Sequence, residues 1–120
     1  MKRAMLVLAA VLLPEAGRLV LQASTPSYQP DDDEIAVADW AFRNGQVAGQ
    51  GTSTLPAADA TYLPLKTGRG IIGVLGVAPQ HGDEPLSSEQ MRLMEASASL
   101  AALAVERALL VESAQHAEPG

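Results

Sequence analysis

The chain lacks cysteine and has few aromatic residues: one Trp, one Phe and two Tyr among its 120 residues. The absence of cysteine excludes disulfides, thiolate zinc sites and a cysteine nucleophile, and it fits a reducing compartment. Because 48% of the residues are nevertheless hydrophobic, the core must consist mainly of Leu, Val, Ile and Ala. A chain of this length suits one ordinary domain with a core of its own.

Basic residues are also scarce. The chain has 8 of them against 14 acidic residues, which gives a formal net charge of −6. The sequence contains no basic run and no alternation of basic with aromatic residues. Nucleic acid is therefore not expected as a direct partner.

The N-terminal segment has two possible interpretations. Two basic residues precede an apolar run at residues 4–13, an order typical of a secretion signal. The run is too short to span a bilayer. Residues 14–17 have a turn sequence and residues 18–23 supply a second apolar strand. A signal peptide would leave that second strand unexplained, so we expect a β-hairpin over residues 5–23.

Residues 31–34 are all acidic, and such a cluster could bind a metal ion or begin a helix. Apolar residues recur at helical spacing immediately after it. Acidic side chains at a helix N-terminus cap free backbone amides and complement the helix dipole. We therefore predict no metal site, but a helix over residues 32–43 that stops at Asn44 and Gly45.

The segment NGQVAGQGTST, residues 44–54, spaces its glycines like a phosphate-binding loop. A dinucleotide fingerprint needs a strand before the glycines and a helix after them, whereas here a helix is expected before them. We therefore predict that Gly45 ends that helix and that residues 44–60 form a long loop. Long loops of this kind are commonly lids or ligand walls.

The second half of the chain predicts a hairpin and a long helix. Apolar and β-branched residues on both sides of a glycine-rich turn predict a hairpin over residues 61–78, with Pro64 at a sheet edge or a bulge. Ser87 and Gln90 match a capping box. Apolar residues at helical spacing follow, so we predict a helix over residues 87–116.

A helix of this length extends about 45 Å at 1.5 Å per residue, which exceeds the depth of a small domain. Its side chains can therefore pack against a second copy of the chain, and an alanine-rich face permits close approach of another helix. We predict a homodimer. The register between its two helices stays open, because the charged residue Arg107 lies near the line along which the helices would meet. The apolar dimer residues are Leu93, Leu100, Leu103 and Val111, and the alanines are Ala98, Ala101, Ala102, Ala104 and Ala108.

Together these elements predict a single α+β domain: an antiparallel β-sheet flanked by helices, with a long C-terminal helix. Three motifs in it are GTSTLP at residues 51–56, YLPL at residues 62–65 and ALAVERA at residues 102–108. Their combination resembles the GAF domains of KdpD-type, potassium-responsive sensor histidine kinases, over about residues 11 to 116. GAF domains usually begin with a helix that packs beside the last one, and no such helix is predicted before residue 5.

The resemblance implies a non-catalytic, cytoplasmic regulatory module of an inner-membrane protein. In that family the module lies between a membrane anchor and the kinase core, which would be its partners, and its last helix leads toward the helix with the phosphoacceptor histidine. This sequence contains neither a phosphoacceptor motif nor an ATP-binding segment. No kinase activity and no cofactor are therefore expected of it.

Small-molecule binding is a second possible function. Direct binding of potassium is not expected, because a hard cation needs several converging oxygens and the carboxylates cluster at one helix start. A methionine sulfoxide reductase, which some GAF-like proteins are, would require cysteine. An unidentified ligand between the sheet and the 44–60 loop would contact Trp40, Gly51, Thr52, Thr54 and Tyr62, unless these residues only form core and turns.

Overall fold

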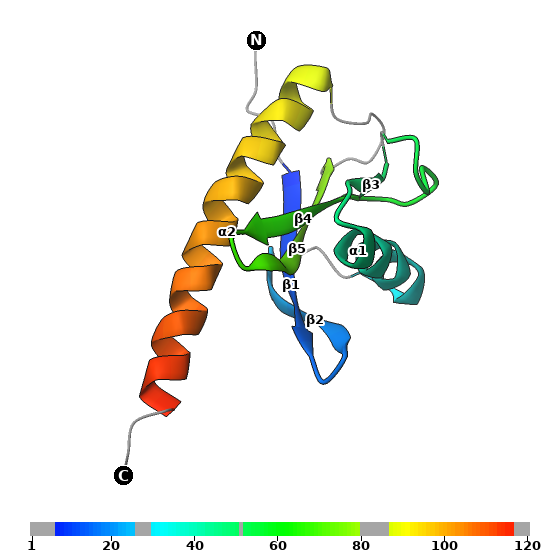
Figure 1. Ribbon diagram of the computed structural model, residues 1–120. Coiled ribbons are helices and arrows are strands. Elements are labelled where there is room, and N and C mark those ends of the chain that lie inside the picture. The colour runs from blue at the N-terminus through cyan, green and yellow to red at the C-terminus, as the bar shows by residue number, and fades with distance from the viewer. Residues whose placement is uncertain (1–6, 26–29, 51, 80–86, 117–120) are drawn as a thin grey trace.

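The computed structural model describes residues 7–25, 30–50, 52–79 and 87–116. They form a five-stranded antiparallel sheet with a helix on each face (Figure 1), as the predicted α+β class requires. The elements in chain order are β1 (Val7–Glu15), β2 (Arg18–Ser24), α1 (Asp32–Asn44), β3 (Ala48–Gly49), β4 (Thr61–Thr67), β5 (Gly70–Pro79) and α2 (Ser88–His116).

The sheet has the strand order β2-β1-β5-β4-β3. β1 pairs with β2 on one side and with β5 on the other, and β5 also pairs with β4. The hairpins predicted over residues 5–23 and 61–78 correspond to the β1–β2 and β4–β5 pairs. Residues 5 and 6, and the segment before them in which no helix is predicted, lie outside the described residues.

The sequence predicts a long loop over residues 44–60, and the structure corrects this prediction by placing a short strand within the segment. Ala48 and Gly49 form β3, which pairs with the start of β4. Gly49 has a φ of +107°, and a Cβ at this position would collide with the carbonyl oxygen of Ala60, so the close pairing requires glycine. A strand of two residues has no alternation that a sequence pattern could reveal.

Among the described residues, β3 pairs only with Thr61 and Tyr62, so the remainder of β4 forms an edge of the sheet. Pro64 lies in this edge portion, as predicted, and the β4–β5 register shifts between Leu65 and Lys66. A proline has no N–H to donate, so at an edge it leaves the hydrogen-bond ladder intact.

Both ends of α1 carry the predicted caps. The Oδ1 atom of Asp31 accepts a hydrogen bond of 2.9 Å from the backbone N–H of Glu34. Gly45 adopts the left-handed conformation at the other end and donates its N–H to the carbonyl of Ala41. The start of α2 also matches its prediction, because Ser87 and Gln90 exchange side-chain to backbone hydrogen bonds. The capping residues therefore set where each helix begins or ends.

α1 packs on one face of the sheet. Its buried residues Ala38 and Ala41 join a core formed by Leu12, Tyr62 and Val74 of three different strands. Alternation along each strand sends the neighbouring side chains to the opposite face. The sheet thus has two separate apolar layers, one under each helix.

α2 covers the second face, where Ala98 and Ala102 are buried against Leu63, Leu65 and Val77. The sequence predicts the alanine-rich face as a surface for a second copy, and for these two alanines that prediction is wrong. Small side chains bring the helix close to the chain's own sheet instead. Figure 1 shows that the C-terminal part of α2 then continues past the sheet.

Replacing Ala102 with Leu should lower the free energy of unfolding by about 1 to 3 kcal/mol, because the larger side chain has no room between α2 and the sheet. The matched change Ala108→Leu should alter it by less than about 0.5 kcal/mol, because Ala108 is exposed. Urea unfolding followed by circular dichroism at one protein concentration gives both values. Equal effects of the two substitutions would contradict the packing of α2.

Candidate functional site

Glu34 differs from its acidic neighbours at the start of α1 because its side chain is buried. It is 8% exposed, whereas the side chains of Asp32 and Asp33 are exposed. Glu34 lies in phase with Ala38 and Ala41, the other buried residues of this helix, so the helix turns its carboxylate toward the sheet. A buried carboxylate requires hydrogen-bond donors.

Two other segments supply those donors. The hydroxyl of Tyr62 on β4 donates to Oε1 of Glu34 at 2.7 Å. The backbone N–H of Asp59 donates to Oε2 at 2.8 Å. Hydrogen bonds to an ionised group are roughly twice as strong as those between neutral groups. Glu34 therefore joins α1 both to β4 and to the loop that precedes β4.

Thr52 and Thr54, two of the predicted ligand residues, form hydrogen bonds within that loop. The hydroxyl oxygen of Thr52 lies 2.8 Å from the carbonyl oxygens of Gly49 and Thr54, and it accepts from the N–H of Thr54 at 3.1 Å. The N–H of Gly49 donates to the carbonyl of Thr54 at 2.8 Å. These bonds close a turn directly after β3. Gly51, another predicted ligand residue, lies outside the described residues.

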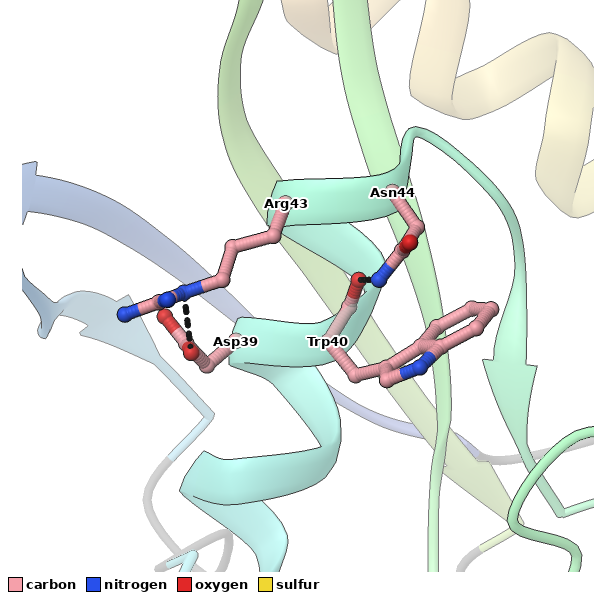
Figure 2. Close-up of polar contacts among 4 residues, drawn as sticks. All are labelled: Asp39, Trp40, Arg43 and Asn44. Carbon is pink, nitrogen blue, oxygen red and sulfur yellow. Dashed lines mark hydrogen bonds and ion pairs between the residues drawn. The ribbon is translucent and has the colours of Figure 1, made fainter.

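Trp40 lies on α1 and is partly buried against the core on that face of the sheet. Figure 2 shows its indole extending from the helix on the side away from the ion pair between Asp39 and Arg43, whose charged atoms are 2.7 Å apart. The side-chain amide of Asn44 donates to the carbonyl of Trp40 at 2.9 Å. This bond fastens the last turn of α1 just before Gly45.

The predicted ligand residues therefore come from α1, the loop and β4, and the structure gives them contacts within the protein. The structure places the side chain of Tyr62 against Glu34 and that of Thr52 against the backbone of Thr54. The hydroxyls of Tyr62 and Thr52 are therefore already hydrogen-bonded to protein groups. These contacts support the alternative roles in core and turns. Sequence reasoning missed Glu34 as the centre of the cluster, although its phase with the buried face of α1 was a usable signal.

Neither a metal-binding cluster nor a membrane-spanning helix is present in the described part of the chain. No group of three or more His, Cys, Asp or Glu side chains in it is arranged to hold a metal ion. No helix there combines the length and the apolar character needed to cross a bilayer.

The side of α2 that faces away from the sheet is the second candidate surface. The turn of an α-helix places its apolar residues on one side, opposite the alanines buried against the sheet. α2 therefore has two apolar sides, and the outer one is uncovered by the described residues. Its predicted dimer residues are Leu93 (60% exposed), Leu100 (70%), Leu103 (59%) and Val111 (52%).

α2 loses contact with the sheet beside the β4–β5 turn. A hollow of about 350 Å³ lies there, lined by Arg69 and Ile72 from the sheet side and by Glu106, Leu109 and Leu110 from the helix. Leu109 and Leu110 are partly exposed on α2. The end of the helix thus has apolar surface that the sheet no longer covers.

Comparison with known proteins identifies close relatives. The model of the GAF domain family matches residues 2–107. The chain is 39% identical over 108 residues to the sensor protein KdpD of Escherichia coli (strain K12), and the aligned part is 89% of this chain and 12% of that protein. KdpD of Clostridium acetobutylicum is 36% identical over 78 residues, which are 65% of this chain and 8% of that protein. The chain thus spans a small part of the length of these relatives.

Two solved structures share the fold. The crystal structure of the native GAF domain of the potassium sensor histidine kinase KdpD from E. coli matches with a TM-score of 0.71 and 37% identity, over 89% of this chain and 74% of that chain. The GAF-B domain of DevS from Mycobacterium smegmatis matches with a TM-score of 0.63 and 26% identity, over 92% of this chain and 85% of that chain. These matches confirm the resemblance that the sequence motifs predict.

Replacing Glu34 with Ala should lower the free energy of unfolding by about 1 to 3 kcal/mol, because the buried hydroxyl of Tyr62 loses this acceptor and such a loss costs about 1 to 3 kcal/mol, whereas Asp59 is exposed and its N–H can bind water. Tyr62→Phe should cost less, since Asp59 still binds the carboxylate. Exposed Asp33 is the matched control, and Asp33→Ala should cost less than about 1 kcal/mol. Chemical unfolding of all these variants and of the Glu34/Tyr62 double variant measures the coupling. Strictly additive effects at Glu34 and Tyr62 would contradict the contact.

Proposed function

The chain belongs to the GAF domain family, and we propose that it is the non-catalytic regulatory module of a KdpD-type sensor histidine kinase in potassium-responsive two-component signalling. In this proposal the module lies on the cytoplasmic side of an inner-membrane protein, between a membrane anchor and the kinase core. Its C-terminal helix carries dimer contacts and signal toward that core. The likeness to the KdpD GAF domain over 89% of the chain supports the assignment.

The observation that carries this proposal is the outward side of α2. Leu93, Leu100 and Leu103 are each more than half exposed, although a large aliphatic side chain gains about 1.5 to 3 kcal/mol when it is fully buried. Single exposed leucines are ordinary on protein surfaces, but a continuous apolar patch marks a contact surface. A second copy presents the same patch, and a two-fold axis along the helix lets each patch cover the other. The proposed state is therefore a homodimer.

β4 provides a route from the loop to this helix. Tyr62 faces α1 and binds Glu34, whereas Leu63 and Leu65 on the other face of the same strand pack under α2. A change in the loop or in α1 that moves β4 would therefore move the surface on which α2 rests. Small translations and rotations of packed helices are an established form of signal transmission.

Ligand binding under the 44–60 loop is the alternative function. A ligand that contacts the hydroxyls of Thr52 or Tyr62 would have to open the loop, because Thr52 binds the loop backbone and Tyr62 binds Glu34. Stabilisation by a nucleotide or cyclic nucleotide, or by potassium but not sodium, in a thermal-shift screen would favour this function. No shift with any of them would favour a module that responds to its neighbouring domains.

Replacing the GAF domain of E. coli KdpD with this chain should give a kinase whose autophosphorylation still responds to potassium. Inserting seven residues after Val111 should preserve the response, because a heptad nearly restores the helix phase. Inserting two residues should abolish it, since this rotates the following helix by about 200°. Autophosphorylation with labelled ATP at low and high potassium measures each chimaera. The same response from both insertions would contradict transmission through a continuous helix.

A further inference from the structure

A hollow of about 220 Å³ lies between the turn of the β1–β2 hairpin and the last turns of α1. Two arginines border this small space, although the net charge of the protein is −6. The apolar residues of the hollow include Pro14, Leu19 and Phe42, and its charged residues are Arg18, Asp39 and Arg43.

We infer that this hairpin hollow binds a small organic monoanion, a carboxylate with a flat apolar body. The site goes beyond the regulatory role proposed above and does not depend on it. A bound carboxylate would contact one arginine from the hairpin and one from α1, and it would therefore join these two elements.

The hairpin hollow is distinct from the ligand site predicted under the 44–60 loop. That loop leads into the start of β4, which pairs with the end of β5, and the end of β5 pairs with the start of β1. The β1–β2 turn is therefore at the opposite end of the sheet. Figure 2 also shows Asp39 and Arg43 on one side of α1 and the indole of Trp40 on another.

The hairpin turn fixes the position of Arg18. Ala16 and Gly17 both have a positive φ, which is typical of the two-residue turns that suit the twist of a hairpin. Arg18 directly follows, at the first position of β2. Its side chain is exposed, and no carboxylate of the described residues forms an ion pair with it. Its guanidinium is therefore available to an anion in the hollow.

Arg43 has donors beyond those that its ion pair uses. Its Nε is 2.7 Å from Oδ2 of Asp39, and a terminal nitrogen extends past that carboxylate (Figure 2). A guanidinium has five N–H donors in a fixed plane, so it can bind more than one carboxylate. A basic residue in the last turn of a helix also complements the helix dipole, which accounts for Arg43 without a ligand. The dipole does not account for Arg18, which borders the same hollow from another element.

The charges and the volume of the hollow define the class of ligand. Two guanidiniums and one carboxylate leave an excess of one positive charge, which a single carboxylate balances and a doubly charged phosphate does not. Drug-sized ligands occupy pockets of about 300 to 1,000 Å³, so this smaller hollow suits a smaller molecule. The half-buried ring of Phe42 offers a surface on which a flat apolar group can stack. A small aromatic carboxylate meets all three conditions.

Titration of the ¹⁵N-labelled protein with sodium benzoate at constant ionic strength tests the site by NMR. The backbone amide signals of Gly17, Arg18 and Arg43 should shift and saturate, whereas those of Thr52 and Tyr62 should stay in place. Benzamide has the same shape without the charge, and it should bind at least about tenfold more weakly. Shifts that do not saturate, or equal binding of benzamide, would overturn the anion site. Tighter binding of inorganic phosphate than of benzoate would overturn the assignment to monocarboxylates.

Two substitutions test the arginines. Arg18→Gln and Arg43→Gln should each weaken benzoate binding by about tenfold, because each removes a charged donor. Arg92→Gln is the matched control: it makes the same change of charge at an exposed position of α2, on the opposite face of the sheet, and it should leave binding unchanged. Arg18→Gln also leaves the ion pair between Asp39 and Arg43 intact, and unchanged circular dichroism spectra check that each variant is folded. Benzoate binding that survives Arg18→Gln, or that Arg92→Gln weakens equally, would overturn the inference.

Discussion

The contact between α2 and the sheet determines which surfaces the domain can offer to other proteins. Ala98 and Ala102 have side chains small enough to bring the helix close to Leu63 and Leu65, and both are buried there. This contact fixes the rotation of the helix about its own axis, because side chains project at set angles along a helix. Leu100 and the other outward residues must then face solvent. Packing within one copy thus decides which apolar residues remain for a partner.

The opposite face of the sheet is held by polar as well as apolar contacts. A buried carboxylate is costly unless donors meet it, and Glu34 obtains donors from β4 and from the loop. α1, the loop and β4 are therefore mechanically linked. Because Tyr62 and Leu63 are adjacent on β4 and face opposite layers, one strand connects this network to α2. In the proposed signalling role, this strand is the connection through which a change at α1 or the loop would reach α2.

Much of the fold could be predicted because its signals are local. Asp31 and Gly45 mark the ends of α1 by chemistry that acts within a turn of the helix, and Ser87 does the same for α2. β3 could not be predicted, because two residues carry no periodicity and their pairing depends on the distant start of β4. The sequence also could not show which side of α2 faces the sheet. The helix is apolar on both sides, and alanine can pack against a sheet as well as against a second helix.

The candidate site was predicted less well than the fold. The sequence predicts Trp40, Thr52 and Tyr62 as ligand residues, and this stays a prediction. It could not show that Glu34 is the acceptor for Tyr62, because the two residues are 28 positions apart. An acidic residue within an acidic run is ordinarily a helix cap or a solvated side chain. Only its phase with Ala38 and Ala41 separates Glu34 from its neighbours. Long-range hydrogen bonds of this kind become visible only when the strands are in place.

Sedimentation equilibrium of the unmodified chain tests most directly whether α2 uses opposite sides for its own sheet and for a second copy. The proposed pairing predicts a particle with twice the mass of one chain at micromolar concentration. It also predicts a folded monomer when Leu100 and Leu103 are both replaced by Glu. A monomeric unmodified chain throughout the accessible concentration range would contradict this use of α2, as would a dimer that persists in the double variant.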